Sequence, residues 1–91
     1  MICTAFIVRI HMPYVRSLKE KRAIVGSVVG RLRSRFNGSF IQGGPLDLWQ
    51  RADIGCALIA GSEQAAQRQK QAILDFLQDD GRFSILETEF L

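Results

Sequence analysis

Residues 2–20 read ICTAFIVRIHMPYVRSLKE, and this stretch decides the fold. Its first half alternates with a period of two, which predicts a β-strand over residues 2–12 that ends at Pro13. The side of this strand expected to face the core carries Ile2, Thr4, Phe6, Val8 and Ile10. In the second half, Ser17 is followed three residues later by Glu20. This pair forms a capping box, so a helix is predicted to begin after Ser17.

Outward from this stretch, apolar residues at helical spacing extend the helix to residue 35 or 36, and Asn37-Gly38 is predicted to end it. The chain then continues through three segments: a short strand at 39–42, an apolar loop at 45–50, and a strand from residue 51 or 52 to residue 60. In the last of these, the alternation predicts that Ile54, Cys56 and Leu58 face the core.

A second helix is predicted after Ser62, its expected N-cap, and Asp79-Asp80-Gly81 ends it. The last strand, over residues 82–90, alternates in such a way that either side could be buried. The resulting order is β-α-β-β-α-β, which predicts an α+β fold of the ferredoxin-like type: a four-stranded antiparallel sheet with two helices on one face. We expect residues 1–91 to form a single domain.

Composition excludes several classes of protein. An apolar content of 47% is too high for a disordered chain, and no apolar run approaches the roughly 18 residues that span a bilayer. The first residues lack the basic leader and small-residue cleavage site of a signal peptide, so we expect a cytoplasmic protein with no membrane partner. Cys3 and Cys56 are expected on opposite faces of the sheet. With one histidine and no CxxC motif, neither a disulfide nor a metal site is predicted.

Charge is distributed unevenly along the chain. Residues 1–51 carry nine basic side chains against two acidic ones, a balance of +7. Residues 52–91 carry three basic side chains against seven acidic ones, a balance of −4. Such polarity favours a polyanionic partner near the first half of the chain, or an electrostatic match between two copies.

A basic cluster lies at the start of the first helix, and we expect it to contact phosphate or RNA. Its predicted members are Arg16, Lys19, Lys21 and Arg22, with Arg51 as an additional contact. The alternative is that these side chains lie along the apolar stripe of the helix and keep their charges in water. A second basic group, Arg31, Arg33 and Arg35, cannot share one face of a helix, so it is expected to form separate patches.

The open face of the sheet is expected to carry small and apolar side chains, which favours a homo-oligomer or another protein contact. The residues predicted for this interface are Ile7, Arg9, His11, Trp49, Ala57 and Ile59. Trp49 has three interpretations: it closes one end of the core, it contacts a second subunit, or it stacks on a base.

No catalytic constellation is recognisable, so an enzyme is not expected. Gly43-Gly44-Pro45 lacks the Gly-Lys-Ser/Thr sequence of a phosphate-binding loop, and no cofactor is predicted. His11 has no nucleophile placed beside it by a motif, which leaves a general-acid role as a weak alternative.

Three motifs resemble those of the YlxP-like family of small bacterial proteins. They are His11-Met12-Pro13, the SLKEKR run at 17–22, and the DLWQRA run at 47–52. The resemblance covers essentially the whole chain and implies the ferredoxin-like fold. The family has no established activity. Its genes often lie among those for translation initiation and ribosome maturation, so the resemblance implies a role linked to translation or to RNA.

From these observations together we expect a non-catalytic accessory protein that associates with RNA or a ribosomal subunit through the basic cluster. The alternative is a homo-oligomeric interaction or regulatory module that binds no nucleic acid. The salt dependence of binding separates the two, because neutralising several phosphates gives a steep dependence and a mostly apolar interface does not.

Overall fold

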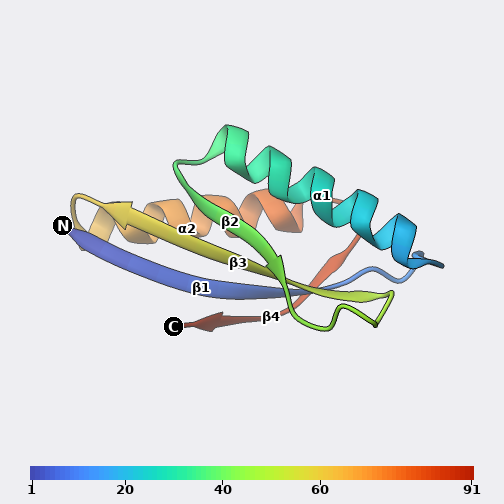
Figure 1. The fold of residues 1–91 in the computed structure, drawn as a ribbon. Helices are drawn as coiled ribbons and strands as arrows, with labels where there is room; N and C mark the ends of the chain where they lie inside the picture. The colour runs from blue at the N-terminus through green and yellow to red at the C-terminus, as the bar shows by residue number, and fades with distance from the viewer.

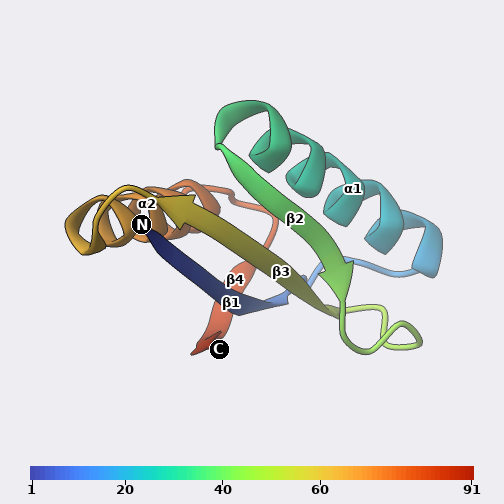
Figure 2. The same cartoon turned by 60° about the vertical axis from the view of Figure 1, so that its left-hand side comes forward.

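The computed structural model describes residues 1–91, and its elements follow the predicted order (Figure 1). They are β1 (Ile2–His11), α1 (Leu18–Arg35), β2 (Gly38–Gly43), β3 (Arg51–Ala60), α2 (Glu63–Gln78) and β4 (Ser84–Phe90). The four strands form one antiparallel sheet in the order β2-β3-β1-β4. Both helices cover the same face and leave the other open (Figure 2). The predicted ferredoxin-like α+β fold is confirmed.

The core lies between the sheet and the two helices. Alternate residues of β1 face it, and Phe6, Val8 and Ile10 are fully buried. The side chains of β3 predicted for the core are buried too, as are those of α1 and α2 that face the sheet: Ile54, Cys56, Leu58, Val25, Val28, Val29, Leu32, Ile73 and Leu77. Cys3 is exposed and Cys56 is buried, as expected for opposite faces of the sheet.

Both predicted helix starts are confirmed. The hydroxyl of Ser17 accepts a hydrogen bond from the Glu20 backbone N–H, and the hydroxyl of Ser62 accepts one from the Ala65 backbone N–H. The Glu20 carboxylate accepts at 3.1 Å from the backbone N–H of Arg16, the residue before the N-cap, rather than from the N–H of Ser17 as in a standard capping box. Each cap satisfies an N–H group that has no partner inside the helix, which stabilises the first turn.

The end of α1 differs from the prediction. The helix ends at Arg35, and Phe36 is its C-cap in extended conformation. Asn37 and Gly38 have no positive φ, so the expected glycine cap is wrong. Gly38 is instead the first residue of β2, where a Cβ atom would lie only 2.7 Å from the carbonyl oxygen of Ala57. Glycine is therefore required there by the close approach of β3.

The structure also settles which side of β4 faces the helices. Ile85 pairs with Ile10, whereas Phe90 pairs with Phe6 and packs against its ring, at 5.8 Å between ring centroids. The register shifts between these pairs, which marks a bulge. An extra residue in a strand reverses its alternation, and this is why period-two reasoning left the buried face of residues 82–90 undecided.

No helix is both long enough and apolar enough to cross a membrane.

Candidate functional site

One end of the molecule gathers the end of β1, the start of α1 and the loop that joins β2 to β3 (Figure 1). Hydrogen bonds hold these segments together. The backbone N–H of Met12 donates to the carbonyl of Gln50 at 2.8 Å, and the Gln50 side-chain amide donates to the carbonyls of Pro13 and Val15 at 3.2 Å each. The loop is therefore fixed against the segment that leads into α1.

Lys21 is the strongest link between this loop and α1. Its ammonium donates to the carbonyls of Pro45 at 2.6 Å and Leu48 at 2.5 Å, and only 1% of the residue is exposed. Burial lowers the pKa of Lys21, while the nearby carboxylates of Asp47 and Asp53 oppose that shift. The prediction that Lys21 contacts phosphate is wrong, because its charge is enclosed by the loop.

The other predicted cations of this end are exposed. Arg16, Lys19, Arg22 and Arg51 all reach solvent. Two aromatic side chains accompany them: Tyr14 is 79% exposed and Trp49 is 50% exposed. We call this set of six residues the basic end.

Trp49 lies outside the hydrophobic core, so it does not close the end of that core. With His11, Gln50 and Arg51 it lines a shallow hollow of about 550 Å³. Trp49 lies in the loop between β2 and β3. Two interpretations of Trp49 remain, a base contact and a subunit contact, and both require the ring to be exposed.

The three arginines near the end of α1 form separate patches, as the helical geometry predicted. The guanidinium groups of Arg31 and Arg35 lie 4.9 and 5.3 Å from the ring centroid of Phe76 on α2. Arg33 points the other way and donates to the carbonyl of Phe40 at 2.9 Å. These contacts join α1 to α2 and to β2, so the second basic group is accounted for by packing.

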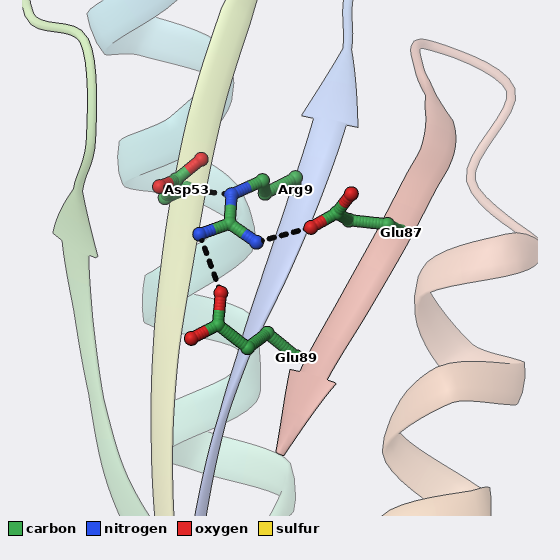
Figure 3. A network of polar contacts seen from close by, with 4 residues as sticks. All are labelled: Arg9, Asp53, Glu87 and Glu89. Carbon is green, nitrogen blue, oxygen red and sulfur yellow. Dashed lines mark hydrogen bonds and ion pairs between the residues drawn. The ribbon is translucent and has the colours of Figure 1, made fainter. Parts of the chain in front are cut away.

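The open face of the sheet carries an ion cluster centred on Arg9 (Figure 3). Its guanidinium contacts Glu87 at 2.5 Å, Glu89 at 2.9 Å and Asp53 at 3.6 Å. The hydrogen bond that Arg9 donates to Glu89 is the main cause that raises the pKa of Arg9. Three carboxylates share one guanidinium, so this Arg9 cluster carries an excess of two negative charges.

Other predicted interface residues flank this cluster. Ile7, Ala57 and Ile59 lie on the open face, with Ala57 and Ile59 exposed and Ile7 half-buried. His11 is half-buried and pairs with Arg51 where β1 and β3 approach the basic end.

Sequence reasoning missed Glu87 and Glu89, because it left the orientation of β4 undecided. The available signal was opposite charge at facing positions, since Glu87 and Asp53 both pair with Arg9 across the sheet. That signal requires the strand register, which one sequence does not contain.

Comparisons with known proteins agree with the predicted resemblance. The family described as "Protein of unknown function (DUF503)" matches residues 3–90. The "Uncharacterized protein YlxP" of Bacillus subtilis (strain 168) is 36% identical to this chain over 61 residues. The aligned segment covers 67% of this chain and 66% of that relative, slightly less than two thirds of its length.

Proposed function

Since the chain belongs to the DUF503 family, whose function is unknown, we propose a function from its surface. The protein is a non-catalytic accessory protein of the cytoplasm that binds structured RNA, as found in a ribosomal subunit, through the basic end. The observation that carries this proposal is the gathering of four exposed cations and two exposed aromatic rings on segments that hydrogen bonds hold in place.

The chemistry of the basic end fits RNA in two ways. Lysine and arginine side chains attract phosphates and release the counterions around them. Exposed aromatic rings such as Trp49 and Tyr14 offer surfaces on which unpaired bases stack. The basic side chains of Lys19 and Arg22 also lie in the first turns of α1, where the helix dipole is positive. A bound phosphate stabilises this arrangement, because it neutralises both the side chains and the helix end.

The open sheet face is less suited to RNA. A sheet that binds single-stranded RNA presents aromatic rings to the bases. Here the corresponding positions carry Ile7, Gly55 and Ile41, with the Arg9 cluster beside them. The excess negative charge of that cluster repels phosphate. We therefore place the RNA contact at the basic end.

Co-sedimentation with purified ribosomal subunits, and filter binding to structured ribosomal RNA, test the proposal at low and moderate salt. The variant Lys19→Glu with Arg22→Glu reverses two charges of the basic end. We expect this variant to bind at least about tenfold more weakly. The slope of log K against log salt, which is negative, should become shallower by about 2. Trp49→Ala is expected to weaken binding by about five- to a hundredfold if the ring stacks on one base.

The matched control is Arg68→Glu with Lys70→Glu on α2, which changes the net charge equally at a site outside the basic end. We expect this control to bind nearly as well as the unchanged protein. Equal losses in both double variants would show that only total charge matters. Binding that survives in Lys19→Glu/Arg22→Glu, or no binding of the unchanged protein at low salt, would contradict the proposal.

A further inference from the structure

The strand register arranges the open face of the sheet in rows that run across the strands. One row is Ile41, Gly55, Ile7 and Glu89, in the order β2-β3-β1-β4. The next row toward the basic end holds Gly43, Asp53, Arg9 and Glu87, and therefore contains most of the Arg9 cluster. The row on the other side carries no charged side chain: it holds Ser39, Ala57, Ala5 and Leu91, whose backbone N–H donates to the carbonyl of Ala5 at 2.9 Å. The face thus changes from apolar to acidic over two rows.

A groove of about 370 Å³ follows the apolar rows. Its lining is mostly apolar, and three of its eleven residues are glycines. At Gly55 the missing side chain makes room for Ile41, which lies so close that a Cβ atom on Gly55 would be 3.2 Å from it. Asp53 lines the end of the groove that adjoins the Arg9 cluster. The groove therefore offers an apolar channel with a carboxylate at one end.

Charge decides what occupies this groove. Glu87 and Glu89 have side chains 62% and 48% exposed, and Arg9 can neutralise only one of the three carboxylates around it. Arg51 lies on β3, two strands from the glutamates on β4, so it does not cancel their charge at that edge. An anionic ligand is disfavoured. Two copies stacked with their Arg9 clusters opposed would bring six carboxylates against two guanidiniums.

Exposed apolar side chains line the groove and continue beyond it. Ile41 and Leu91, which line the groove, are 62% and 73% exposed, and Ile59, which lies outside it, is 56% exposed. A small molecule in the groove would leave Ile59 in water. An extended protein segment would cover the whole patch, and exposed apolar patches of this kind mark such contacts.

We propose that this groove binds an extended segment of another protein, with an aliphatic side chain in the apolar rows and a lysine or arginine two residues away at the Arg9 cluster. The spacing follows from strand geometry. Neighbouring rows are two residues apart along a strand, and side chains two residues apart in an extended segment repeat at the same distance of roughly 6.6 Å. The inference does not depend on RNA binding, because it uses a different face.

Nuclear magnetic resonance of the ¹⁵N-labelled full chain tests the proposal with a synthetic peptide, acetyl-Gly-Leu-Ser-Lys-Gly-amide. We expect it to shift the backbone amide signals of Ile7, Ile41, Gly55 and Glu89. Two matched peptides replace the lysine by glutamate or the leucine by serine, and each should bind at least about fivefold more weakly.

Variants of the protein locate the contact. Ala57→Leu fills the groove from an exposed position, and we expect it to abolish the shifts, whereas Ala23→Leu on the exposed side of α1 should not. Glu87→Gln with Glu89→Gln should remove the preference for lysine over glutamate. Circular dichroism of each variant checks that it is folded.

Three results would overturn the proposal. The first is the absence of shifts at millimolar peptide, and the second is equal binding of the lysine and glutamate peptides. The third is a dimer in analytical ultracentrifugation that Ala57→Leu dissociates and Ala23→Leu does not. That result would assign the groove to a second copy of this chain.

Discussion

Lys21 is the only charged residue among the buried ones, and its position explains how the basic end keeps its shape. Its place in α1 was readable from the sequence: Leu18, Lys21, Val25 and Val28 follow at helical spacing, so Lys21 lies on the apolar side. Its partners were not readable. They are carbonyls 24 and 27 residues further along the chain, in a loop whose path only the tertiary structure defines.

At this scale we predict the effect of Lys21→Met, which keeps the length and apolar stem of the side chain but removes both hydrogen bonds. The carbonyls of Pro45 and Leu48 then lose their donor, so the free energy of unfolding should fall by about 1–3 kcal/mol. Urea denaturation measures this change. Trp49 is the only tryptophan, so its fluorescence anisotropy reports whether the loop becomes mobile.

Lys19→Met is the matched control, because Lys19 is exposed two residues away on the same helix. It should change stability by less than about 0.5 kcal/mol and leave the anisotropy unchanged. Equal effects of the two variants would mean that the Lys21 contacts do not hold the loop.

Among the elements, the two helix starts were the most predictable features, because a serine cap acts within three residues of itself. The strands β1 and β3 were equally clear, since buried residues occupy every second position over Phe6–Ile10 of β1 and along the whole of β3. The end of α1 and the orientation of β4 were not predictable. The first depends on how closely Gly38 approaches β3, and the second on a bulge, and neither leaves a local pattern.

The glycines of α1 provide a prediction about this helix. A Cβ atom at Gly26 or Gly30 would meet nothing within 4 Å, and both residues are exposed. Replacing either with alanine should stabilise the protein by up to about 1 kcal/mol, because alanine loses less backbone entropy in a helix. Gly38→Ala should destabilise it, since the new Cβ atom would approach the backbone of Ala57. Thermal denaturation of the three variants compares them, and a loss of stability in Gly30→Ala would contradict this account.

In the whole molecule, the charge difference between the two halves of the sequence appears as a difference between two surfaces, one basic and one acidic. The cations of the basic end, Arg16, Lys19, Arg22 and Arg51, all come from residues 1–51, while the three acids around Arg9 on the open face all come from residues 52–91. Four of the five cations predicted for phosphate contact reach solvent, because exposure is the usual state of a charged side chain. The acidic surface could not be predicted, since it is assembled from three strands.

The free energy of unfolding of the whole protein should depend on pH in the alkaline range because of Cys56. Burial raises the pKa of its thiol from 9.0 to about 12, so the unfolded chain releases this proton at lower pH than the folded protein. Stability is therefore fully present below pH 9.0 and decreases as pH rises from 9.0 toward 12. We expect the unchanged protein to lose up to about 1.4 kcal/mol per pH unit in this window relative to Cys56→Ala.

Urea denaturation at several pH values measures this difference. Cys3→Ser is the control, and because Cys3 is exposed, this variant should keep the pH dependence of the unchanged protein. Parallel curves for Cys56→Ala and the unchanged protein would contradict this prediction, because they would show that folding does not change the pKa of the Cys56 thiol.

The position of β1 inside the sheet has a consequence for how the protein forms during its synthesis. Of the four strands, β1 leaves the exit tunnel before the others, yet in the sheet it is flanked by β3 on one side and on the other by β4, which emerges after the other three. While the chain is still growing, one edge of β1 has no neighbour, and Arg9 lacks both glutamates. A nascent chain that ends before β4 therefore exposes an unpaired edge, which is a site for aggregation or for a chaperone. Completion of the sheet must wait until residues 84–90 have emerged.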